Sequence, residues 1–300
     1  MLKTPQYRGY KCSQDPDLKN HAQITRQAAA DGMVILENQN NALPLSSTEA
    51  GKVAAFGNSS YEFISGGTGS GDVNEAYTVS LIEGLKNGGF KPDADLSQIY
   101  ISHINTMRKQ AGKPKNFITS LLGGKEPVAE MEVTPELARR MAFENDLAII
   151  TIGRNSGEGI DREPIEGDFY LTKAEKQMIK NVSTAFQYQS KKAIVILNIG
   201  GPIETLSWRD FPDAVLLSWQ PGQEAGNSVV DILTGKVTPS GKLAVTFPIY
   251  YNDSPSSSNF PGHAIEGAID ETKDLSGFSI MKRTPWEVIY KEDVFVGYRY

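Results

Sequence analysis

Five short apolar runs, separated by helical patterns, constrain the fold of this chain more than any other feature. They are Val53–Phe56, Leu147–Ile152, Ala193–Leu197, Ala214–Trp219 and Leu243–Phe247. Each run is nearly continuously apolar and does not alternate strictly with polar residues, which is typical of strands buried on both faces of a parallel sheet. Such a sheet needs helices on both sides. The sequence therefore predicts an α/β fold, a three-layer α/β/α sandwich with a mostly parallel sheet.

The helical patterns between these runs carry clear start and stop signals. Thr134-Pro135 offers an N-cap followed by proline in the first turn. Thr172-Lys173-Ala174-Glu175 matches the capping box. Another helix is expected after Gly222 and ends at about Leu233, where Gly235 can close it in the left-handed conformation.

The remaining stretches set the expected domain boundaries. Residues 1–20 are predicted to be a linker, residues 21–248 the α/β domain, and residues 249–300 an irregular C-terminal segment of the same domain. Residues 97–130 begin helically and then become rich in Lys, Gly and Pro, which favours a surface excursion. The aromatic end, Phe295–Tyr300, is interpreted as a segment that is cut off.

Composition argues against several classes of partner. The chain has 300 residues and a formal net charge of −6, whereas nucleic-acid binding needs a basic face, so no nucleic-acid partner is expected. The sequence has no run of about 18 apolar residues, so it predicts no membrane span. A single cysteine and three well-separated histidines do not indicate a metal centre. We expect no metal and no cofactor.

The loop Gly153–Tyr170 carries the main candidate for chemistry. It directly follows an apolar run and holds five carboxylates and two arginines. Carboxylates crowded near guanidinium groups can have pKa values pushed apart, as acid/base catalysis requires. Glu158 stands out because its flanking glycines clear space for a substrate, whereas Asp161 and Arg162 are expected to shape the loop by pairing. The competing interpretation for any of these carboxylates is a solvated or ion-paired structural role.

A second glycine-rich loop, Ser65–Asn74, follows the first predicted strand. Glycines let a backbone approach a ligand closely, and Ser70 and Asp72 offer hydrogen-bonding groups. The loop lacks the GxxxxGK[ST] phosphate-binding pattern, and GxGxxG is not matched at the strand-to-helix turn. A tight turn whose glycines serve only its geometry is the alternative.

With these loops the chain resembles the α/β-sandwich domain of family 3 glycoside hydrolases, the β-glucosidase and β-xylosidase group. The resemblance covers nearly the whole chain, and its closing segment is similar to Val296–Tyr300. An entry helix, the two substrate-facing loops and two further motifs occur in order: Ala28–Asn38 with Leu43–Leu45, Gly67–Asp72, Ser156–Arg162, Trp219–Gly226 and Leu233–Leu243.

The resemblance implies a shared active site. In that family a preceding (β/α)8 barrel supplies the nucleophilic aspartate and most sugar-binding groups, and the sandwich supplies the general acid/base. That residue would be Glu158, and Ser70 would contact the sugar; Asp72, Asp161 and Arg162 would shape the loops. No nucleophile is expected in this chain, because the Ser-Asp-Trp motif and the Lys-His pair are missing.

The resulting prediction is the acid/base-bearing domain of a retaining, exo-acting β-glycosidase, with a β-glucosidase favoured. Its partners would be a β-glucoside or oligosaccharide substrate and the barrel of the same parent chain; alone it is expected to be inactive or nearly so. A non-catalytic carbohydrate-binding or interaction domain is the alternative. A flavodoxin-like nucleotide binder rests on fold class alone. Periplasmic, secreted and cytoplasmic locations are all compatible with the sequence.

Overall fold

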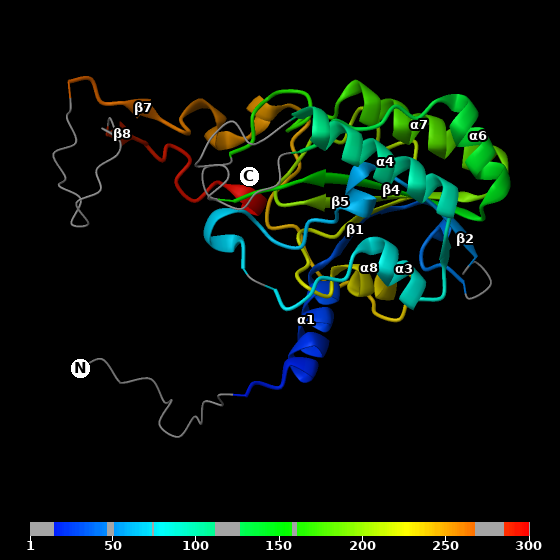
Figure 1. Cartoon of the computed structure of the whole chain (residues 1–300). Coiled ribbons are helices and arrows are strands. Elements are labelled where there is room, and N and C mark those ends of the chain that lie inside the picture. Colours follow the sequence, from blue (N-terminus) through cyan, green and yellow to red (C-terminus); the bar gives the residue numbers. More distant parts are fainter. Residues whose placement is uncertain are drawn as a thin grey trace.

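A six-stranded sheet lies between two layers of helices in the computed structural model of the chain (Figure 1). The structure describes residues 15–46, 51–73, 75–111, 127–157, 161–267 and 285–299. The strand order is β1-β6-β5-β4-β2-β3, and every neighbouring pair is parallel except β1 with β6. The strands are β1 (Val34–Asn38), β2 (Lys52–Phe56), β3 (Lys91–Pro92), β4 (Leu147–Arg154), β5 (Lys192–Ile199) and β6 (Ala214–Leu217). The predicted sandwich is confirmed.

The two helical layers explain why the central strands are apolar throughout. One face is covered by α4 (Ala94–Ala111), α6 (Pro135–Glu144) and α7 (Lys173–Tyr188), and the other by α1 (Leu18–Gly32), α3 (Leu81–Asn87) and α8 (Ala225–Leu233) (Figure 1). Along β4, Ala148 and Ile150 belong to the first core, whereas Leu147 and Ile149 belong to the second. Successive side chains of a strand point to opposite faces, so both sets must be apolar.

The helix signals are confirmed. Thr134 accepts a hydrogen bond from the backbone N–H of Leu137 at 3.2 Å, with proline in the first turn. Thr172 and Glu175 form the full capping box at the start of α7. Gly235 follows the end of α8 with φ +70°, a left-handed conformation that glycine adopts without a Cβ penalty.

Two predicted elements are wrong. Leu243–Phe247 forms no strand: Leu243 and Phe247 pack partly against the first core, but β1 takes the place beside β6 and the segment joins no ladder. The predicted entry helix, Ala28–Asn38, ends at Gly32, and Val34–Asn38 is strand β1, because its apolar residues pair antiparallel with β6. In both places an apolar run alone does not separate a strand from a packed loop or helix.

The outer segments also have defined structure where they are described. α1 begins at Leu18 with Asp17 as its N-cap, so the last three residues of the predicted linker are helical. The C-terminal segment contains three short 3-10 helices, η4 (Tyr251–Asp253), η5 (Pro255–Ser258) and η6 (Gly297–Arg299), and the short antiparallel strands β7 (His263–Ala264) and β8 (Trp286–Glu287). None of the described helices combines the length and apolar content needed to cross a membrane.

Candidate active site at the carboxyl edge of the sheet

Four loops meet where the parallel strands β2, β4, β5 and β6 end. They contain residues 65–72, 155–157, 200–201 and 219–222, in the order of the strands they follow. The carboxyl ends of parallel strands share one edge of a sheet, where ligands of open α/β folds usually bind. Both glycine-rich loops singled out in the sequence therefore lie at the same edge.

The two glycine-rich loops touch each other through backbone. The N–H of Thr68 donates to Ser156 O at 3.0 Å, and Thr68 and Gly157 form a parallel bridge. A Cβ at Gly157 would lie 2.1 Å from Thr68 Oγ1, and one at Gly67 would lie 2.8 Å from Ser156 O. Contacts that short do not occur, so these two glycines are required by the approach of one loop to the other.

Asn198, near the end of β5, ties two of these loops to the core. Its buried side chain accepts a hydrogen bond from Ile64 N at 2.6 Å and donates to Ile64 O at 2.9 Å and to Trp219 O at 2.8 Å. Sequence reasoning missed this residue. The available signal was an amide inside an otherwise apolar strand, since a buried amide has to find hydrogen-bonding partners.

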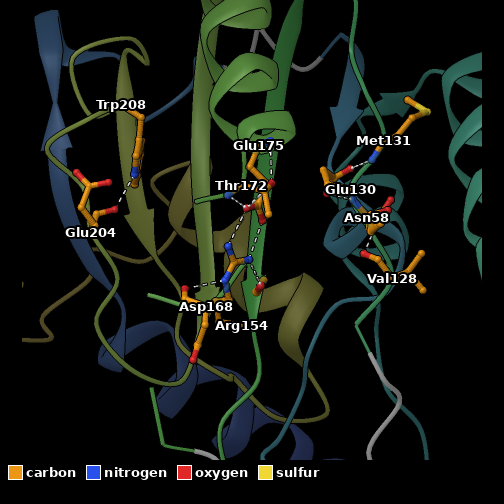
Figure 2. A network of polar contacts seen from close by, with 12 residues as sticks. Asn58, Val128, Glu130, Met131, Arg154, Asp168, Thr172, Glu175, Glu204 and Trp208 are labelled. Atoms are coloured by element: carbon orange, nitrogen blue, oxygen red, sulfur yellow. Dashed lines mark hydrogen bonds and ion pairs between the residues drawn. The ribbon is translucent and has the colours of Figure 1, made fainter. Parts of the chain in front are cut away.

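Arg154 is the last residue of β4 and lies immediately before the segment 155–162, which contains the catalytic candidate Glu158 (Figure 2). Its guanidinium donates twice to the carboxylate of Glu175, at 2.7 and 2.8 Å, and Nε donates to Asp168 O at 2.9 Å. The two side chains of the ion pair are only 8% and 7% exposed. Burial alone would raise the pKa of Glu175. The hydrogen bonds and the positive charge of Arg154, together with the hydrogen bonds from Thr172, hold the pKa of Glu175 below its usual value.

Arg162 closes the loop that follows. It forms an ion pair with the Asp168 carboxylate and donates to Asn155 O at 2.5 Å, so that the two ends of the segment 155–162 are held together. Asp168 also accepts from Glu163 N at 2.6 Å. The Tyr251 hydroxyl donates to Arg162 O at 2.8 Å and joins the C-terminal segment to the loop.

The predicted site residues are distributed as follows. Glu158, with Gly159 and Ile160, lies outside the described residues. Ser70 belongs to the turn η3 (Gly69–Gly71), and Asp72 follows it in an exposed position. Asp161 is exposed and contributes, after burial, to a raised pKa of Tyr251. The structure thus brings the loop of Ser70 and Asp72 against Gly157, the residue that leads into Glu158.

A second carboxylate beside this edge was not singled out from the sequence. Glu130 accepts hydrogen bonds from the backbone N–H groups of Asn58 and Met131, both at 2.9 Å (Figure 2). Asn58, the first residue of the short helix α2 (Asn58–Tyr61), donates in turn to Val128 O at 3.1 Å and to Ala129 O at 3.0 Å. These contacts fasten residues 128–131 to the end of β2.

Glu130 should make stability fall as the pH rises. Burial raises its pKa from 4.5 to about 7, against the effect of its two N–H donors; Glu175 adds to the rise and Arg154 opposes it. The folded state therefore holds the proton more tightly than the unfolded state, and this contribution, on the order of 3 kcal/mol, is complete below pH 4.5 and lost between pH 4.5 and 7. Chemical denaturation at pH 5, 6, 7 and 8 measures it.

In that experiment Glu130→Gln should flatten the decline of the unfolding free energy. Glu136→Gln is the matched control: Glu136 is exposed, and its pKa is lowered, first by backbone hydrogen bonding, so it titrates below this window. Equal pH profiles for the wild type and Glu130→Gln would show that Glu130 does not titrate between pH 5 and 8.

The described residues hold no group of three His, Cys, Asp or Glu side chains placed to bind a metal ion. The described side chains that meet at this edge offer hydroxyl, amide, carboxylate and guanidinium groups. In general, a carboxylate held on a loop at such an edge can transfer a proton to or from a bound ligand.

Comparison with known proteins gives a consistent result. Residues 33–298 match the model of the glycosyl hydrolase family 3 C-terminal domain. The chain is similar to β-glucosidase A of Butyrivibrio fibrisolvens, with 33% identity over 94% of this chain and 32% of that protein. It is also similar to β-glucosidase 3B of Thermotoga neapolitana, whose structure in complex with glucose matches with 44% identity and a TM-score of 0.81 over 98% of this chain and 38% of that one.

The relatives do not all carry the name β-glucosidase. An exo-α-(1→6)-L-arabinopyranosidase of Bifidobacterium breve is 27% identical over 95% of this chain and 32% of that protein. The chain thus spans about a third of the length of these relatives.

Proposed function

This chain belongs to glycosyl hydrolase family 3, whose C-terminal domain it matches, and we propose that it supplies the general acid/base, Glu158, of a retaining β-glycosidase acting on terminal β-D-glucosides. The observation that carries the proposal is the packing of the segment 155–157 against the loop 65–72 at the carboxyl edge of the sheet. Glu158 follows that segment directly. Arg162 closes the same loop from its other end.

In the proposed reaction Glu158 first protonates the glycosidic oxygen while a second carboxylate attacks the anomeric carbon. The bond to the leaving group breaks and a glycosyl-enzyme forms; Glu158 then takes a proton from the water that releases the sugar. Ser70 hydrogen-bonds a sugar hydroxyl, and Asp72, Asp161 and Arg162 shape the two loops.

The nucleophile has to come from another domain. In a retaining enzyme the two carboxyl groups stand about 5 Å apart, and the family resemblance provides no nucleophile motif within this chain. The relatives have about two thirds of their length outside the part that this chain matches, which leaves room for the proposed (β/α)8 barrel. The active site would then form where the barrel meets the carboxyl edge of the sheet.

The favoured substrate is a β-glucoside. The name β-glucosidase is shared by the Butyrivibrio and Thermotoga relatives, and the Thermotoga structure was solved with glucose. The arabinopyranosidase relative makes the choice of sugar a matter for experiment.

A grafted enzyme tests the proposal. In it, this chain replaces the matching 38% of Thermotoga neapolitana β-glucosidase 3B. The grafted enzyme and the chain alone are given 4-nitrophenyl β-glucoside, β-xyloside and N-acetyl-β-glucosaminide, and the control has the Thermotoga domain restored at the same junctions. We expect the grafted enzyme to hydrolyse these substrates, with the glucoside preferred, and the chain alone to be inactive or nearly so.

Two outcomes would oppose the proposal. Turnover by the chain alone at a comparable rate would place the nucleophile within residues 1–300. An active control beside a folded but inactive graft would favour a non-catalytic carbohydrate-binding domain.

A further inference from the structure

The amide of Gln220, in the loop after β6, contacts both glycine-rich loops. Its Nε2 donates to Asn155 Oδ1 at 2.7 Å and to Gly66 O at 3.4 Å, and its Oε1 accepts from Ser156 Oγ at 3.1 Å. One partly buried side chain thus joins the loop 65–72 to the segment that leads into Glu158. Donor and acceptor ends of the amide are both used, which fixes its orientation.

The space around this amide is cleared by glycines. A Cβ at Gly200 would lie 1.8 Å from Ser156 Oγ and 2.9 Å from Gln220 Oε1. The loop after β5 therefore admits the Ser156–Gln220 contact only because residue 200 has no side chain. Four loops converge on one hydrogen-bonded amide, and such close packing leaves little freedom for the segment 155–157.

The backbone before Gln220 is held in an unusual conformation. Trp219 has φ +56°, in the left-handed region that bulky residues rarely adopt. Its carbonyl accepts from Asn198 Nδ2 at 2.8 Å, and Asn198 is itself buried in β5. Strain of this kind persists where the surrounding structure over-determines it, and it clusters at functional sites.

We infer that Gln220 is a positioning residue for the proposed reaction: by holding Asn155 and Ser156, it sets the place from which Glu158 delivers its proton. Gln220 acts through the loop and not on the substrate. The inference rests on the proposed role of Glu158 and adds the residue that orients it.

A positioning role has a distinct kinetic signature. Displacement of a catalytic group by about 1 Å can cost about 100-fold in rate, and here the cost should appear only where proton transfer to the leaving group matters. In the grafted enzyme, Gln220→Met keeps the side-chain length and removes every hydrogen bond, and Gln220→Ala is the second variant. For both we expect kcat/KM on phenyl β-glucoside to fall roughly 10- to 100-fold and on 2,4-dinitrophenyl β-glucoside by less than about threefold.

Gln177→Met is the matched control. Gln177 Nε2 also donates to an asparagine, Asn181 Oδ1, at 2.7 Å, but on the exposed side of α7. It should leave kcat/KM on both glucosides unchanged. Thermal unfolding of all three variants shows whether any of them is unfolded at the assay temperature.

A double variant separates this inference from the proposed function. If Gln220 acts through Glu158, Gln220→Met should cause no further loss in a Glu158→Ala background, because a missing acid cannot be misplaced. Equal losses on the two glucosides, or a further loss in that background, would overturn the inference and leave a structural role for Gln220. If Glu158→Ala itself shows no dependence on the leaving group, the proposed function fails first.

Discussion

Glu158→Ala in the grafted enzyme is expected to lower kcat/KM on phenyl β-glucoside by about 10³-fold. Phenolate is a poor leaving group that needs its proton as the glycosidic bond breaks. The 2,4-dinitrophenolate ion leaves without a proton, so kcat/KM on that glucoside should change by less than about tenfold. Steady-state rates on the two glucosides give the ratio that defines a general acid.

Azide provides an independent measurement on the same variant. Without the general base, water attacks the glycosyl-enzyme slowly and this intermediate accumulates during turnover of the dinitrophenyl glucoside. Azide needs no base, so added azide should raise kcat and release β-glucosyl azide. Glu166→Ala, which removes an exposed carboxylate from the same stretch Gly153–Tyr170 but one with no proposed role, should show neither effect. Equal losses on both glucosides with no azide product would remove Glu158 from this role.

The fold was largely predictable because strands buried on both faces of a sheet must consist mainly of apolar residues, and such runs are visible in the sequence. Helices cover both sides of β4 and β5, so both strands are predominantly apolar, with polar residues such as Arg154 and Asn198 near their carboxyl ends. Capping is equally local: Thr134 and Thr172 cap helices with groups three residues away. The outer strand β1 was less predictable, because it is defined by its antiparallel pairing with β6 and not by its own residue pattern.

The site was predictable only in part. The glycines of both loops could be read from the sequence, but their reason lies in a contact between Thr68 and Gly157, which are far apart along the chain. The one local signal of Asn198 is its position as an amide in a mostly apolar strand, and Gln220 carries no comparable signal. Buried amides need partners, and those partners are supplied by tertiary structure.

Glu175 shows how one residue can serve two levels of structure. The sequence correctly assigns it to the capping box of α7, where it accepts from Thr172 N at 2.8 Å. The structure adds the guanidinium of Arg154, which lies 21 positions earlier, at the end of β4. The same carboxylate therefore starts a helix and holds the strand from which the candidate loop departs.

Arg154→Met should have the largest effect on stability among these variants, a loss of about 3–5 kcal/mol in the free energy of unfolding. Methionine keeps much of the apolar volume of arginine but leaves the Glu175 carboxylate buried without its counter-charge. The side chain of Glu175 is only 7% exposed, so water cannot replace the guanidinium. Chemical denaturation of the chain at pH 7 measures the loss.

Arg139→Met is the control for loss of a surface arginine. Arg139 pairs with Glu136 at 2.8 Å, but these side chains are 65% and 73% exposed, so the variant should be close to the wild type. The variant Arg154→Met with Glu175→Gln should recover part of the loss, because a neutral amide is cheaper to bury than an unpaired carboxylate. Equal effects of Arg154→Met and Arg139→Met would show that the buried pair contributes no more than a surface pair.

The pH dependence of that loss gives the sharpest test, because its sign is fixed. In the wild type the pKa of Glu175 is lower in the folded state than in the unfolded state. The resulting stabilisation is present above the pKa of the unfolded state, and it is lost as the pH falls through the pKa of the folded state. Without Arg154, burial dominates and raises the pKa of Glu175, so protonation relieves the unpaired charge. The difference between wild type and Arg154→Met should therefore shrink from pH 7 to pH 5, whereas a loss due to packing alone would stay constant.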